Sequence, residues 1–155
     1  MEPKEKKVIA TNSKAFRDYF FYGTFECGIA LKGCEVKSIR SGDVNFKDSF
    51  ACIREGEIML YNFYISPYAQ ASYMNENPDR VRKLLLHKKE VEKLTVAVNQ
   101  KKMALIPTKI YLNKRGWVKV ELALGKGKKL YDKREEIKKR DIERSLKRTI
   151  HSRRR

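Results

Sequence analysis

Few residues of this 155-residue chain have the types and spacing that catalysis needs. Glu26 and Glu35 are nine residues apart on different predicted strands, where they could meet as an acid pair for proton transfer. Solvent-facing carboxylates or partners for Lys and Arg explain them more simply. His87 and Glu90 lie one turn apart at a predicted helix start, where a histidine is more often a surface group than a general base. Nucleophile-elbow, zinc-protease and phosphate-loop motifs are all missing from the sequence, so we expect no catalytic residues and no enzyme.

The cysteines and histidines do not form a metal-binding pattern. Cys27, Cys34 and Cys52 are odd in number and lack CxxC spacing, which is typical of free thiols in a reducing cytosol. His87 and His151 are too few and too far apart for a conventional zinc site. We therefore expect neither a metal nor a cofactor.

Positive charge is the main functional signal. The formal net charge is +17, and residues 126–155 contribute +9 of it, with fourteen Lys and Arg against five Asp and Glu. A basic chain that keeps its aromatic residues favours a nucleic-acid partner over a membrane surface. With no secretory signal and no apolar run approaching ~20 residues, we expect a cytoplasmic protein without membrane contact.

A second basic cluster lies inside the chain. Arg80, Arg82 and Lys83 follow Pro78 and precede the apolar run 84–86. Such cations can clamp phosphates, and arginine adds a fork geometry that lysine lacks. A solvated run of charge is the alternative. Aromatic residues are interleaved with the basic positions, and one or two of them can stack on unpaired bases.

Strand patterns dominate the elements that must position these residues. A helix is expected at 13–19 with Asn12 or Ser13 as its N-cap, and an aromatic-rich strand at 20–31, where Gly28 indicates a bulge or a close backbone approach. Further strands are expected at 34–40, 50–54, 58–65, 103–112 and 117–124, and a second helix at 87–100. This set is typical of a mainly β protein, a small OB-like antiparallel barrel with two to three flanking helices. We expect residues 1–125 to form the body and 126–155 a basic tail.

Several short strings occur together in one order. They are ECG at 26–28, GCEVKS at 33–38, DS at 48–49, PDRVRKLLLH at 78–87 and GKGKKLYDKR at 125–134. Any one string is weak evidence, but the GxEVKS, RxRKLLL and GKGKKxxDKR patterns together are highly specific. From about Lys7 to Arg140 the chain resembles the SsrA-binding protein family, the small protein B of bacterial trans-translation.

The resemblance implies an adaptor that is not itself a catalyst. Members bind the tRNA-like domain of transfer-messenger RNA at its elbow and carry the alanyl-charged RNA to ribosomes stalled without a stop codon. A basic tail, unstructured in free solution, enters the decoding site of 16S rRNA and the empty mRNA channel. Implied partners are therefore transfer-messenger RNA and the ribosome, with elongation factor Tu and alanyl-tRNA synthetase reached indirectly through the RNA. We expect a monomer.

The same resemblance assigns residues to the two RNA contacts. Glu26, Leu85 and Lys119 fall on RNA-binding positions of the family, although packing is an equally good explanation of Leu85, and Asn12 matches a family asparagine. Adding the basic cluster, the expected contacts to transfer-messenger RNA are Asn12, Glu26, Arg80, Arg82, Lys83, Leu85 and Lys119. The expected contacts to the ribosome are Lys126, Lys128, Lys129, Tyr131, Asp132, Lys133 and Arg134. Some members have histidine in place of Tyr131, and we expect this ring to stack on a decoding-site base.

The tail has the charge pattern of a marginal helix. Three acid-first pairs are four residues apart, namely Glu135–Lys139, Glu136–Arg140 and Glu143–Lys147. They contribute about 1 kcal/mol in total, which is too little to offset helix nucleation. We expect the tail to be disordered when free and helical among rRNA phosphates. A structural ribosomal protein and an RNA-processing enzyme remain as alternatives.

Overall fold

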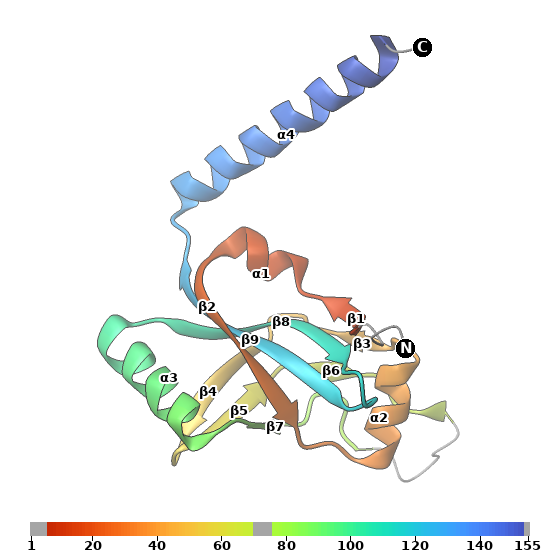
Figure 1. Cartoon of the computed structure of the whole chain (residues 1–155), viewed down its shortest axis with the longest axis vertical. Helices are drawn as coiled ribbons and strands as arrows, with labels where there is room; N and C mark the ends of the chain where they lie inside the picture. Colours follow the sequence, from red (N-terminus) through yellow and green to blue (C-terminus); the bar gives the residue numbers. More distant parts are fainter. Residues whose placement is uncertain (1–5, 70–75, 154–155) are drawn as a thin grey trace.

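Antiparallel strands form a barrel from which one long helix projects (Figure 1). The computed structural model describes residues 6–69 and 76–153. The strands are β1 (Lys7–Thr11), β2 (Tyr19–Ile29), β3 (Val44–Asn45), β4 (Phe50–Arg54), β5 (Glu57–Tyr61), β6 (Tyr64–Ile65), β7 (Arg82–Leu85), β8 (Ala104–Leu112) and β9 (Val118–Gly127). The helices are α1 (Ser13–Asp18), α2 (Gly33–Arg40), α3 (Lys88–Lys101) and α4 (Leu130–Arg153).

The main sheet closes on itself. Its strand order is β1-β8-β4-β5-β7-β2-β9, and a further pairing of β8 with β9 joins the two sides. β1 pairs with the 109–112 end of β8, and β3 and β6 form a separate two-stranded sheet. Closure leaves few unpaired strand edges. The prediction of a mainly β, OB-like antiparallel barrel with flanking helices is confirmed.

The barrel core follows from alternation along the strands. In β5, Ile58 and Leu60 are buried while the residues beside them are not. Helix α3 adds Leu94 to the core, and Val91 and Val98 pack against it as their helical spacing predicts. Burial of side chains of this size stabilises a fold by about 1.5–3 kcal/mol each.

One predicted strand is wrong, because residues 33–40 form helix α2. Glu35, Ser38 and Ile39 are its buried residues, and their spacing is that of one helix face. The Glu35 carboxylate also accepts a hydrogen bond from the backbone N–H of Lys32 (3.0 Å), which satisfies a donor at the helix start. The predicted strand 58–65 is also divided, since Asn62 has a φ of +59° between β5 and β6.

Gly28 marks a close approach and not a bulge. The irregularity in β2 lies between Phe21 and Gly23. A Cβ on Gly28 would lie 3.2 Å from the Cβ of Leu85 on β7, closer than most side chains tolerate. The missing side chain therefore lets β7 come close to β2.

The tail is a helix that leaves the barrel (Figure 1). β9 continues to Gly127, which pairs with Tyr19, and α4 follows as 24 residues, about 36 Å at ~1.5 Å per residue. Its apolar residues Ile137, Ile142 and Leu146 are more than half exposed. Disorder of the free tail in solution stays a prediction. Of the helices in the described residues, none is both long enough and apolar enough to cross a membrane.

Candidate nucleic-acid interface

Three of the predicted RNA contacts meet on one face of the barrel. Gly28 on β2 is paired with Leu85 of β7 on one side and with Lys119 of β9 on the other. Glu26 lies two residues before Gly28, on the same side of β2. These residues line a groove of about 630 Å³. The pairing of three strands thus joins positions that are far apart in the sequence.

Glu26 is held in place as an ionised acceptor. The Tyr111 hydroxyl donates a hydrogen bond to its Oε2, and Lys6 Nζ lies 3.3 Å from the same oxygen. The bond from Tyr111, aided by Lys6 and the charge of Lys119, holds the pKa of Glu26 below its ordinary value against the opposing effect of partial burial. Within the part of the chain that the structure describes, both bonds end on Oε2, so Oε1 is available to accept from a ligand.

The groove also contains residues that the sequence prediction missed. Trp117, which immediately precedes β9, lines it and is 68% exposed. His87 and Glu90 line it from the start of α3, where the Glu90 carboxylate accepts from the His87 backbone N–H (3.3 Å). Trp117 and Lys119 are two residues apart at a strand, so parity alone places them on one face. This two-residue spacing was the signal in the sequence that could have identified Trp117 as a groove residue.

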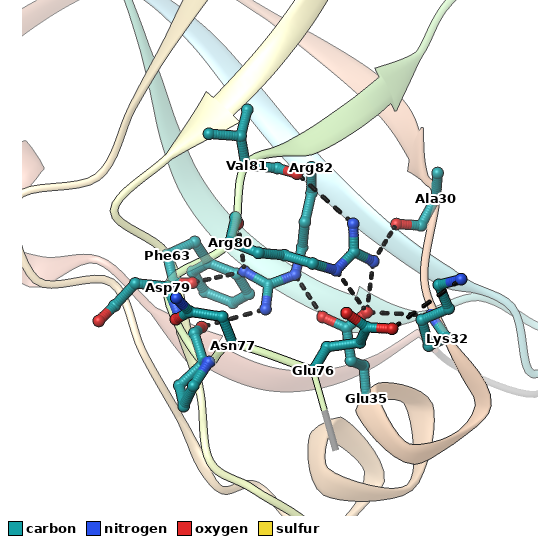
Figure 2. A network of polar contacts seen from close by, with 11 residues as sticks. Ala30, Lys32, Glu35, Phe63, Glu76, Asn77, Asp79, Arg80, Val81 and Arg82 are labelled. Carbon is teal, nitrogen blue, oxygen red and sulfur yellow. Dashed lines mark hydrogen bonds and ion pairs between the residues drawn. The ribbon is translucent and has the colours of Figure 1, made fainter. Parts of the chain in front are cut away.

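The basic cluster belongs mainly to a buried ion-pair network around Glu35 (Figure 2). The Arg82 side chain is 1% exposed, and its Nε lies 2.5 Å from Glu35 Oε2. Its two terminal nitrogens donate to the carbonyls of Phe63 (2.7 Å) and Pro78 (3.0 Å). A phosphate cannot reach this guanidinium, so the prediction that Arg82 contacts RNA is wrong. Arg82 instead ties the 78–82 segment to α2 and to the loop before β6.

Arg80 and Lys83 remain at the surface with partners of their own. Arg80 is one-quarter exposed, donates through Nε to Glu35 Oε1 (3.2 Å) and pairs through Nη2 with the same oxygen. Lys83 Nζ lies 2.7 Å from Glu57, and both side chains are about half exposed. Lys83 can still face a phosphate, because its pair is open to solvent, whereas Arg80 offers a phosphate only the exposed quarter of its side chain.

Glu35 is part of this network and does not form an acid pair with Glu26. Burial alone would raise the pKa of Glu35, but hydrogen bonds from Arg80, the Lys32 backbone and Arg82 outweigh it and hold the pKa below its ordinary value. Glu26 has Tyr111 as its main partner instead. The two carboxylates thus have separate structural tasks.

Asn12 is a structural residue. It caps α1, its Oδ1 accepting from the Ala15 backbone N–H (3.2 Å), and its Nδ2 donates to the Pro107 carbonyl (2.9 Å). The side chain is buried and both ends of its amide are used. The predicted N-cap is confirmed, whereas a direct contact between Asn12 and RNA does not fit this structure.

The start of the tail is joined to the body. Lys128 is buried, its backbone N–H donates to the Asp18 carbonyl (2.8 Å), and its Nζ pairs with Glu136 and lies 4.8 Å from the centre of the Phe20 ring. Lys133 Nζ lies 3.4 Å from Asp18 Oδ1. Lys128 is thus a joint between β9, α1 and α4, and the prediction that it contacts the ribosome does not fit this arrangement.

The other predicted ribosome contacts lie on either side of this joint. Lys126, Lys129 and Arg134 are exposed, and Asp132 is half-buried. The side chain of Tyr131 lies outside the described residues, so its stacking role stays a prediction.

A closed barrel with a polar and aromatic groove and a basic projecting helix defines a nucleic-acid-binding protein. Among the described residues, no group of three His, Cys, Asp or Glu could hold a metal ion. A family model described as SmpB protein matches residues 9–152. The chain belongs to the SmpB family.

Related proteins of known name cover almost the whole chain. The SsrA-binding protein of Caldanaerobacter subterraneus subsp. tengcongensis is 57% identical over 145 residues, 94% of this chain and 91% of the relative. That of Bacillus pumilus is 49% identical over 153 residues, covering 99% and 97%. A solved chain described as "tmRNA-SmpB: a journey to the center of the bacterial ribosome" shares 52% identity with a TM-score of 0.66, over 88% of this chain and 96% of that one. This membership agrees with the expectation of an RNA-binding adaptor and not an enzyme.

Proposed function

We propose that this protein binds the tRNA-like domain of transfer-messenger RNA through the groove face and delivers it to stalled ribosomes in the cytoplasm. The observation that carries the proposal is the row formed by Leu85, Gly28 and Lys119 with Glu26 beside it. The groove offers an apolar wall, an ionised acceptor and a cation to one ligand. The names of the relatives and of the solved complex support transfer-messenger RNA as that ligand.

In this proposal the cations and the carboxylate of this face contact different parts of the RNA. Lys119, with Arg80 and Lys83 at the edges of the neighbouring surface, attracts phosphates without regard to sequence. Glu26 repels phosphate and accepts from base edges or 2′-hydroxyls. A face that combines these groups binds RNA where bases are exposed, as they are in the loops of a tRNA-like fold.

The tail is assigned to the ribosome in the same proposal. α4 is long, thin and basic, and its apolar stripe is unburied, which suits a channel lined by rRNA phosphates. Lys126, Lys129, Asp132, Lys133 and Arg134 are the proposed contacts near the decoding site, and Tyr131 is the proposed stacking residue. In this proposal elongation factor Tu and alanyl-tRNA synthetase act on the bound RNA, and the protein itself is a monomer.

Binding of the purified full chain to the tRNA-like half of transfer-messenger RNA, compared with an elongator tRNA, tests the first half. We expect a clear preference for the former, which weakens steeply with salt. Equal affinity for the two RNAs would refute it.

Removal of residues 130–155 tests the division between body and tail. We expect the truncated protein to keep most of its RNA affinity and to lose peptide tagging on stalled ribosomes. Loss of RNA binding on truncation would show that the division is wrong. Stoichiometric sedimentation with all ribosomes would instead favour a structural ribosomal protein.

A further inference from the structure

We propose that the groove receives one unpaired base of the bound RNA, packed against the indole of Trp117, with an amino-bearing edge of the base facing Glu26. The inference rests on the proposed function, because it names the part of the RNA that the same groove accepts. It adds Trp117 as a contact residue and gives Glu26 a preference among bases.

Trp117 is placed for a ligand and not for the core. Its side chain is the most exposed of the large apolar residues in the described part of the chain. Its backbone is nevertheless fixed, since its N–H donates to Asn113 Oδ1 (2.9 Å) and its carbonyl accepts from the Asn113 N–H (2.9 Å). Gly116, with a φ of +82°, completes the turn. A rigid backbone under an exposed ring lowers the entropy lost when the ring is covered.

The lining of the groove suits a flat ring. Leu85 lines it from β7 and Trp117 from the residue before β9, on either side of β2, and Leu85 is half exposed. Gly28 pairs with Leu85 and Lys119, and the Leu85 side chain leans over it, with Cδ1 3.5 Å from where a Gly28 Cβ would be. Leu85 and Trp117 thus give the groove two apolar sides for an aromatic ligand, and every base has an aromatic face.

The charges of the groove favour a nucleotide over an apolar peptide side chain. Glu26 is ionised, and its Oε1 can only accept hydrogen bonds. Adenine, cytosine and guanine each carry an amino donor, whereas uracil has none. Lys119 stands across β2 from Leu85 and can meet the phosphate of the same nucleotide. An apolar side chain would offer nothing to Oε1 of Glu26 or to the Lys119 ammonium.

The emission of Trp117 tests the stacking directly, because it is the only tryptophan of the chain. Titration of the full chain with the tRNA-like half of transfer-messenger RNA should quench this emission. The midpoint should match that of binding measured by anisotropy of end-labelled RNA. Unchanged emission at full binding would overturn the inference and leave the proposed function standing.

Substitutions give the second readout. Trp117→Leu should weaken RNA binding by about 5–150-fold, the usual effect of removing one base–aromatic stack, and Trp117→Phe should restore part of it. Tyr22→Leu is the matched control, since Tyr22 is exposed on β2 away from the groove. Wild-type affinity of Trp117→Leu would overturn the inference. Equal binding of the tRNA-like RNA and an elongator tRNA would refute the proposed function instead, whatever the emission does.

A panel of RNAs with one abasic nucleotide at each unpaired position identifies the base. One position should lose both the quenching and the affinity, and its effect should not add to that of Trp117→Leu. Uracil at that position should keep the quenching but bind wild-type protein more weakly than an amino-bearing base, and this difference should shrink with Glu26→Gln, whose amide can also donate. Full additivity at every position would contradict a shared contact.

Discussion

Replacement of Glu35 by glutamine tests the buried network in Figure 2. Glu35 is 4% exposed and Arg82 1% exposed, so the change would leave a buried guanidinium without its counter-charge. Removal of one member of a buried ion pair costs about 3–5 kcal/mol. For a protein of this size, that cost lowers the melting temperature by roughly 6–20 °C. We expect Glu35→Gln to lower the melting temperature by an amount within this range at neutral pH.

The same network predicts a dependence of stability on pH. Because the pKa of Glu35 is lower in the folded state, its contribution is fully present above the unfolded-state pKa of about 4.3. It is lost as the pH falls through the lower folded-state value. Wild type should therefore lose more stability than Glu35→Gln in acid, and the difference between them should narrow.

Thermal unfolding and urea unfolding, each followed by circular dichroism at several pH values, measure the melting temperature and the free energy of unfolding. Glu57→Gln is the matched control, because the Glu57–Lys83 pair is half exposed and such pairs contribute about 0–1 kcal/mol. If Glu35→Gln lost no more stability than Glu57→Gln, the reasoning from burial would be refuted.

Three further outcomes follow from single side chains. Asn12→Ala should lower the free energy of unfolding in urea by about 1–3 kcal/mol, because it removes the cap of α1 and the donor to Pro107, without changing the RNA affinity of the folded protein. Burial raises the pKa of Cys27 to about 12, so a thiol reagent at pH 8 should label Cys27 only after unfolding, and rapid labelling of the native protein would contradict this. Lys128→Met should widen the distribution of spin-label distances between body and tail, as should Glu136→Gln, and wild-type widths would show that the joint does not set the tail direction.

The barrel was predictable because alternation and turn residues are local signals. Helix α2 was not, since Cys34 and Val36 alternate as in a strand. The residues that it buries include Glu35 and Ser38, which are polar. Only the arginines from a distant segment explain why a carboxylate is buried there. The helix therefore depends on a tertiary contact that no window of eight residues contains.

The site was predicted in part for the same reason. Leu84 of β7 is buried and Leu85 is exposed, and strand parity then places Arg82 inside with Leu84. This signal was present in the sequence, but the positive charge of Arg82 favoured a surface role. The grouping of Leu85 with Lys119 is different in kind, because it depends on which strands flank β2, and strand order was not predictable.

β9 has a mechanical consequence for the whole molecule. The same strand contains Lys119 at the groove and ends, eight residues later, at Gly127, directly before the joint at Lys128. At ~3.3 Å per residue, the two ends are separated by about 26 Å of extended backbone. β2 lies beside this whole length, and β8 supports it from the other side. A force applied to α4 is therefore transmitted along a strand that is paired on both sides, toward the groove proposed to bind RNA.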